Sequence, residues 1–234
     1  MAGQDESATA SGRPAGRRRR RRWTLWSGLA LVLVGLAVLA WVGWQLYGTN
    51  LVSQRRHEQT VDRLEQEWDG PGPQARATVE TAQGTATAIL RIPAFGDDYA
   101  VPVLEGVADE ALAAGVGHFE SSAGPGDVGN YALAGHRITH GEPLRDLPAL
   151  AAGDEVVVET RDTVYTYVLD TGGAQLRVPF TAGWVVDAQP VNPDGGVGPR
   201  GGEDRLITLT TCAELFHTDD RLVAFGHLRS AVAR

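Results

Sequence analysis

Residues 23–47 restrict the fold more than any other part of the chain, because they run for 25 residues without a charged side chain. The run reads WTLWSGLALVLVGLAVLAWVGWQLY. A helix needs about 20 apolar residues to cross a bilayer core, so the run predicts one transmembrane helix with some tilt. Trp23 and Trp26 mark one membrane interface, and Trp44 and Tyr47 mark the other.

Six consecutive arginines at 17–22 precede this run. Arginines beside a membrane segment stay in the cytoplasm, so residues 1–22 are predicted to be a cytoplasmic tail and residues 48–234 to lie outside the cell. A cleaved signal peptide is the alternative, with small residues at 38–40, but apolar sequence continues to Leu46. Arg21–Arg22 imitates only part of a twin-arginine signal. We therefore expect an uncleaved single-pass anchor.

The charge of the chain is uneven. Beyond residue 47 there are 14 arginines against 27 acidic residues, and the chain has no lysine. Phosphate binding requires a basic face, so an acidic body argues against nucleic acid as a partner. The arginine run could by itself suggest an RNA-binding tail, but its place directly before an apolar stretch favours a membrane-topology signal.

Residues 48–78 are predicted to be a stalk or linker. Within it, 51–68 shows an apolar stripe at helical spacing, formed by Leu51, Val61, Leu64 and Trp68. The sequence DGPGPQ at 69–74 then breaks the helix.

Residues 79–234 change to short apolar runs bounded by Gly and Pro, including a strand region predicted at 180–191. Seven or eight strands with few helices indicate a mainly β domain, either a barrel or a sandwich.

Cys212 is the only cysteine, so no internal disulfide can form, and an exported lone cysteine is either a reactive thiol or an intermolecular crosslink. It ends an alternating strand at 206–212, and Arg221 opens the next strand. If these strands pair antiparallel, the two residues lie near each other. A neighbouring cation favours the nucleophilic thiolate, and a guanidinium can also stabilise an oxyanion.

Thiol catalysis also needs a histidine as acid and base, and the chain has six. His136 is the best candidate because it ends a strand and precedes a polar loop. His57 lies in the stalk, which we interpret as the wrong region. His227 lies inside the last strand and is read as structural. His217 follows Cys212 in a loop and is the reserve candidate.

Metal binding is not expected. His136 and His140 have H-x-x-x-H spacing, which binds zinc when both lie on one helix face, but Gly135 and Gly141 bracket them. GDD at 96–98 and NPDGG at 192–196 carry oxygens suited to calcium, yet they fit ordinary turns. We expect no cofactor.

Three motifs occur in order along the chain: LAGHR (residues 133–137), TLTTC at 208–212 and RLVAF at 221–225. With these motifs the chain resembles sortases, the membrane-anchored cysteine transpeptidases of Gram-positive cell surfaces. The stretch from Gly115 to Leu147 is similar to the class E group of actinobacteria. The similarity covers about residues 85–228 and implies a closed sortase-type β-barrel.

The resemblance also implies roles. Cys212 would attack the threonine carbonyl of a sorting motif, His136 would act as general acid and then general base, and Arg221 would hold the substrate or stabilise the oxyanion. Thr211 would line the substrate site. His118 lies in the similar stretch but matches no catalytic position of the family, so it is read as structural.

The implied reaction cleaves Leu-Ala-X-Thr-Gly between Thr and Gly through a thioacyl-enzyme. A peptidoglycan-precursor amine then resolves this intermediate, so the partners would be secreted proteins with a C-terminal sorting signal and the cell wall.

Two alternatives stay open from the residues. Water could replace the amine, which would make the protein a thiol hydrolase. The domain could instead be a non-enzymatic β-barrel adhesin or assembly module in which Cys212 is a small buried apolar residue.

Overall fold

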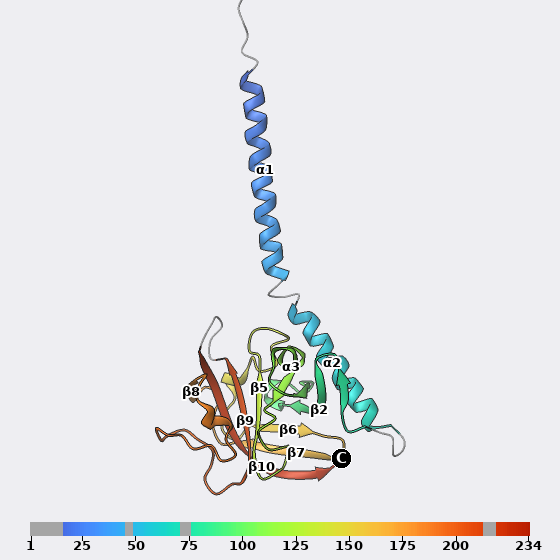
Figure 1. Ribbon diagram of the computed structural model, residues 1–234, viewed down its shortest axis with the longest axis vertical. Helices are drawn as coiled ribbons and strands as arrows, with labels where there is room; N and C mark the ends of the chain where they lie inside the picture. Colours follow the sequence, from blue (N-terminus) through green and yellow to red (C-terminus); the bar gives the residue numbers. More distant parts are fainter. Residues whose placement is uncertain (1–15, 45–48, 71–75, 213–218) are drawn as a thin grey trace, which may run out of the picture. The chain divides into compact units, whose positions relative to one another are not determined.

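The computed structural model describes residues 16–44, 49–70, 76–212 and 219–234, with side chains except at 16–25, 49 and 212. The chain divides into two compact units, Met1–Gln45 and Leu46–Arg234. Within the first unit, helix α1 spans Gly16–Gly43 (Figure 1). Its segment Trp26–Gly43 has a mean hydropathy of 2.1, so α1 is long and apolar enough to cross a membrane.

The second unit is built around a closed ring of eight strands (Figure 1). The ring is closed by the pairing of β2 with β6, so the mainly β barrel predicted from the sequence is confirmed. In ring order the strands are β2 Gly84–Arg91, β3 Val101–Glu105, β4 Val116–His118, β5 Gly129–Gly135, β9 Arg205–Cys212, β10 Asp220–Ala233, β7 Thr163–Leu169 and β6 Glu155–Glu159.

Most neighbours in the ring are antiparallel, but two pairs, β3 with β4 and β5 with β9, are parallel. Two further strands extend the sheet: β1 (Val79–Thr81) pairs with β2, and β8 (Leu176–Pro179) pairs with the start of β10. The described helices of this unit are short apart from α2 (Thr49–Trp68); they are α3 Asp109–Ala114 and the 3₁₀ turns η2 Pro93–Phe95, η3 Leu147–Ala149 and η4 Gly183–Val186.

The barrel interior holds the main hydrophobic core. Residues that alternate along the strands point inward, as expected where one face of a strand is buried. Tyr131, Leu133, Ile207 and Leu209 belong to this cluster and are each at most 1% exposed. The parallel pair β5–β9 therefore has a fixed register, which determines where the two strands end.

Helix α2 packs on the outside of the barrel. Val61, Leu64 and Trp68 are buried against β2 and α3, as the apolar stripe predicts. Leu51, the first residue of the predicted stripe, is instead 51% exposed. An ion pair also joins α2 to β2, because Arg91 Nη2 donates to Glu65 Oε1 at 2.8 Å.

The strand predicted at 180–191 is wrong. The chain there forms the 3₁₀ turn η4 and a loop, and the neighbouring strand β8 ends before it at Pro179. Tertiary contacts explain the difference, because the amide of Asn130 donates to the carbonyls of Val185 and Asp187, each at 3.1 Å. These bonds satisfy the backbone of a turn that local β-propensity disfavours.

Candidate active site

Three separate segments bring the predicted site residues to one end of the barrel. In the antiparallel pair β9–β10, Arg221 lies directly opposite Cys212, so the strand pairing predicted for these two residues is confirmed. In the parallel pair β5–β9, Ala134 lies opposite Thr210. His136 follows β5 directly, at the same end of the sheet as Cys212.

One buried hydrogen bond joins the ends of β5 and β9. The Thr211 hydroxyl donates to the carbonyl oxygen of Gly135 at 2.7 Å, and the Thr211 side chain is only 2% exposed. The residue after Thr211 is Cys212, and the residue after Gly135 is His136. This bond therefore fixes the backbone immediately before each of the two predicted catalytic residues.

A cleft of about 470 Å³ opens at this end of the barrel. Its walls are mostly apolar and come from α3, β8, η4 and the residues around them. His136, Thr210, Thr211, Arg221 and Asp109 supply its charged and polar lining. Directly paired positions in a sheet share a face, so the Cys212 position lies on the face to which Arg221 contributes.

Arg221 is half-buried at the mouth of this cleft. Its guanidinium lies over the ring of Phe180, 5.0 Å from the ring centroid, and Nη1 donates to the Asp220 carbonyl at 3.2 Å. Phe180 also lines the cleft and is 67% exposed, which is unusual for a phenylalanine. The cation–π contact orients the flat guanidinium beside the cleft.

His136 is partly buried, and its ring stacks on that of His140 with 4.6 Å between the ring centroids. The pKa of His136 is lowered from 6.5 to about 4, chiefly because burial removes water from the charged form. The nearby His140 and Arg221 lower this pKa as well, and only Asp109 opposes them. In this arrangement the His136 imidazole is neutral at pH 7 and can accept a proton.

His57 lies nearer to the site than its position in the predicted stalk suggests, although it does not line the cleft. His57 is on α2, is 3% exposed, and lies against Gly141 in the loop that follows His136. Burial lowers its pKa from 6.5 to about 4, the carbonyl of Ala113 partly offsets this by accepting a hydrogen bond, and His140 lowers it further. His57 is thus a neighbour of the site, reached through a long-range contact that its sequence position does not reveal.

The other histidines lie elsewhere. His118 Nδ1 is 2.9 Å from Glu105 Oε2, and its Nε2 is 3.0 Å from the Ala123 carbonyl oxygen. His227 Nδ1 is 2.8 Å from Asp170 Oδ1. Both rings are held in barrel contacts away from the cleft lining. His217, the reserve candidate, lies outside the described residues.

A buried polar network supports one wall of the cleft. Thr208 donates to Asn130 Oδ1 at 2.8 Å, and both side chains are fully buried. Since Asn130 in turn donates to carbonyls of the η4 region, the wall carrying Val185 is tied to β5 and β9. A buried network whose members all have partners holds one conformation.

Sequence reasoning missed Phe180 and the contact of His140 with His136. No local pattern marks Phe180, which lies at the start of the strand predicted at 180–191. The H-x-x-x-H spacing marks His140 as a partner of His136, but the helical geometry that this spacing implies is not the one found. The chain instead turns through left-handed backbone at His140, with φ of 54°, and this folds the second ring back onto the first.

Comparison with known proteins agrees with this geometry. The sequence profile of the sortase domain matches residues 90–229. Sortase SrtE1 of Streptomyces coelicolor is 32% identical over 209 residues, which cover 86% of this chain and 56% of that protein. The chain thus spans little more than half the length of this relative. Sortase SrtE2 of the same species is 27% identical over 95% of this chain and 89% of its own length.

Solved structures give the same result. The structure of sortase E from Streptomyces avermitilis is 38% identical, with a TM-score of 0.56, and the match covers 66% of this chain and 93% of that one. Sortase E1 from Streptomyces coelicolor, solved with a tripeptide in its active site, is 32% identical with a TM-score of 0.54, over 67% of this chain and 94% of that one.

Proposed function

The chain belongs to the sortase family of transpeptidases, and from this membership we propose that it cleaves a Leu-Ala-X-Thr-Gly-like sorting motif between Thr and Gly through a thioacyl-enzyme on Cys212. One observation carries the proposal. The Thr211–Gly135 hydrogen bond and the Cys212–Arg221 register bring the ends of three strands together beside the cleft that His136 lines.

The first step follows from the protonation state of the site. Neutral His136 takes the proton of the Cys212 thiol, and the sulfur attacks the threonine carbonyl of the motif. A thiolate beside the ring raises the pKa of His136, since an adjacent negative charge stabilises imidazolium. The imidazolium then protonates the glycine nitrogen as the peptide bond breaks, leaving a thioester and a free amine.

The second step reverses the proton transfers. An amine of a cell-wall precursor attacks the thioester carbonyl, neutral His136 accepts its proton, and Cys212 leaves as the thiolate and is reprotonated. The product is a new amide bond between the substrate threonine and the acceptor. Arg221, oriented by Phe180, would stabilise the oxyanion that forms in both steps.

The cleft suits a peptide of this kind. Its apolar walls, among them Leu112, Val185 and Phe180, would bind the Leu and Ala side chains of the motif. The tripeptide found in the active site of the Streptomyces coelicolor sortase E1 supports peptide binding in the corresponding region. The preference for alanine at the second position is carried by the similarity to class E enzymes.

We also propose that α1 anchors the enzyme in the membrane with its N-terminus in the cytoplasm. The arginines at 17–22 precede an apolar segment long enough to span the bilayer, which supports this orientation. Secreted substrates and lipid-linked amines would then both reach the catalytic unit outside the cell.

Mass spectrometry tests the proposed reaction. The full chain in detergent is incubated with a Leu-Ala-X-Thr-Gly peptide, with and without an acceptor amine. We expect an acyl adduct on Cys212, which the amine converts to a transpeptidation product. Cys212→Ala should form neither. If native Cys212 resists thiol-reactive probes and no adduct forms, the reading as an adhesin or assembly module replaces this one.

A further inference from the structure

The loop that follows His136 has an unusual backbone. His140, Gly141 and Glu142 have φ values of 54°, 82° and 55°, so three consecutive residues are left-handed. Side chains other than glycine are disfavoured in this region because Cβ approaches the neighbouring carbonyl oxygen. Such a conformation persists only where the surrounding structure holds it in place.

Asn50, at the start of α2, supplies contacts that hold this loop. Its Nδ2 donates to the Ile138 carbonyl at 3.2 Å and to Glu142 Oε1 at 2.6 Å. The backbone N–H of Gly141 donates to Asn50 Oδ1 at 3.2 Å. A single side chain therefore uses both ends of its amide, and its three bonds reach across the left-handed segment.

His57 reinforces the same contact two helical turns further along α2. A side chain on residue 141 would place its Cβ 2.7 Å from His57 Cε1, so the loop approaches the helix at van der Waals distance. Among the described side chains, His57 Nε2 is the buried polar atom that has no hydrogen-bond partner. Leaving a buried polar atom unsatisfied costs free energy, so other contacts of α2 with the loop must offset this cost.

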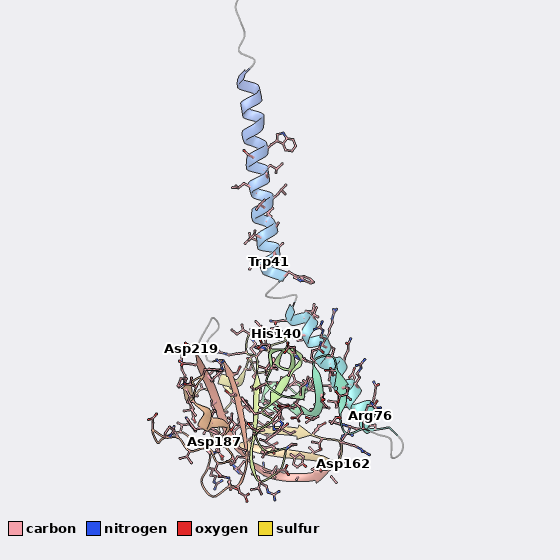
Figure 2. All side chains as sticks on the ribbon, viewed as in Figure 1. Trp41, Arg76, His140, Asp162, Asp187 and Asp219 are labelled. Carbon is pink, nitrogen blue, oxygen red and sulfur yellow. The ribbon has the colours of Figure 1, made fainter. Side chains whose placement is uncertain are left out.

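This loop carries His140 onto His136. The rings stack with an interplanar angle of 29°, and Figure 2 shows His140 toward the end of the unit where α2 begins. Contacts thus run without a gap from Asn50 through the loop and His140 to the imidazole that lines the cleft. The other ionisable groups facing His136 are Asp109 from α3 and Arg221 from β10, while His57 faces His140 from α2.

We propose that Asn50 is a positioning residue for the transpeptidation reaction, which holds His140 against His136 by fixing the 138–142 loop. The proposal rests on the function proposed above for His136. With the loop in place, His136 is shielded from water on one side and keeps one ring orientation. Helix α2 is then part of the catalytic architecture and more than a connection between the apolar segment and the barrel.

Asn50→Ala in the full chain in detergent tests this role. Released from Asn50, the loop should leave His136 and admit water, so the pKa of His136 should rise from about 4 toward 6.5. Histidine NMR measures this pKa, with the resonance assigned from the His136→Gln variant. Because small displacements of catalytic groups are costly, kcat for the sorting peptide should fall about ten- to a hundred-fold, while KM changes little.

Glu65→Gln is the matched control. It weakens another contact of the same helix with the barrel, the ion pair with Arg91, at a place remote from the loop. We expect kcat and the pKa of His136 to stay as in the unaltered chain. If both variants changed kcat and this pKa equally, the cause would be a weaker packing of α2 on the barrel as a whole. The specific role of Asn50 would then be refuted.

A rescue pair keeps the test decisive if Asn50→Ala folds poorly. Asn50→Asp places a carboxylate opposite Glu142 and should be as harmful as the alanine variant. Adding Glu142→Gln provides an amide N–H that donates to the carboxylate introduced at position 50. The new amide oxygen at position 142 can still accept from Arg145, which in the unaltered chain donates to Glu142 Oε2 at 2.8 Å. The double variant should therefore recover part of the lost kcat and lower the pKa of His136 again, although the Ile138 carbonyl stays without its donor from position 50.

Two results overturn the proposal: Asn50→Ala with normal kcat and an unchanged pKa of His136, or lost kcat with an unchanged pKa and no rescue in the double variant. If the unaltered chain itself forms no acyl adduct, the proposed function fails instead. The NMR measurement still shows in that case whether Asn50 controls the surroundings of His136.

Discussion

Thr211→Val is the substitution that most directly tests how the site is assembled. Valine matches threonine in shape but cannot donate the 2.7 Å hydrogen bond to the Gly135 carbonyl. Both groups are buried, so the carbonyl loses its partner without gaining water. Leaving a buried acceptor unsatisfied costs about 1–3 kcal/mol, and we expect the free energy of unfolding to fall by that amount.

The effect on catalysis should exceed the effect on folding. The lost bond lies one residue before Cys212 and one residue before His136, so the ends of β9 and β5 become able to separate. A displacement of about 1 Å between catalytic groups can reduce a rate about a hundred-fold, and we expect kcat to fall at least about ten-fold.

Two further variants separate the hydroxyl from its surroundings. Thr211→Ser keeps the donor and loses a methyl group, so it should lose about 1 kcal/mol of stability and retain most of kcat. Thr171→Val removes another buried threonine hydroxyl, which accepts a hydrogen bond from the Phe225 N–H at 2.9 Å away from the cleft. It should destabilise the fold to a similar extent without lowering kcat.

Urea unfolding followed by circular dichroism gives the stabilities, and turnover of a quenched fluorescent Leu-Ala-X-Thr-Gly peptide gives kcat. If Thr211→Val loses stability but keeps the kcat of the serine variant, the hydroxyl only supports the fold. The argument that it aligns the two strand ends would then be refuted.

Three other substitutions probe the neighbouring groups. His136→Gln should reduce kcat/KM by about 10²–10⁴-fold, as loss of an acid–base group does, and near-normal turnover would move the role to His217. Arg221→Lys should also reduce kcat, because an ammonium replaces neither the planar donor fork nor its stacking on Phe180; an unchanged rate would show that positive charge alone is needed. His57→Gln should reduce acid sensitivity. The pKa of His57 is lowered from 6.5 to about 4 in the folded state, so the unfolded chain binds a proton at His57 first as the pH falls. The stability that neutral His57 contributes is therefore complete above pH 6.5 and is lost as the pH falls to 4. For this side chain, which is 3% exposed, the loss corresponds to about 3 kcal/mol. Urea unfolding at pH 7 and pH 4 should show that the variant loses less stability than the unaltered chain. Equal losses would contradict the low pKa of His57.

Much of the fold follows from short-range patterns. Alternation places Ile207 and Leu209 inside the barrel, and Gly and Pro separate the strands. The pattern fails at 180–191, where Val185 and Val186 favour a strand but the buried Asn130 amide stabilises a turn. It also fails at Leu51, which lies ten residues before Val61. At about 3.6 residues per turn this spacing places Leu51 on a different side of α2 from the buried Ser53, His57 and Val61. The outcome at 180–191 therefore depends on a distant segment, whereas the outcome at Leu51 depends on the helical phase.

In the site, too, contacts between neighbouring segments of the chain could be predicted from the sequence, whereas contacts between distant segments could not. Cys212 ends one strand and Arg221 opens the next strand along the chain, so the sequence permits their antiparallel pairing, and the register confirms it. The parallel pair β5–β9 needs a long crossover, and no local spacing places His136 beside Cys212. That expectation depended on the resemblance of the motifs to a known family. Motifs therefore identify the residues that carry out the proposed chemistry, even where the sequence does not reveal how those residues are arranged in space.

The residues that surround His136 have no such signal. Asn50, His57 and His140 act on it through one left-handed loop, and each is an ordinary residue in its own segment. Motif similarity identifies groups that exchange protons or form bonds, whereas the pKa of those groups depends on burial and on neighbours supplied by other elements. Two chains with the same LAGH and TLTTC motifs can thus differ in their working pH if the helix before the barrel presents a different side chain to the loop. Variation at position 50 should accordingly shift the pH dependence of kcat while leaving the peptide cleft unchanged.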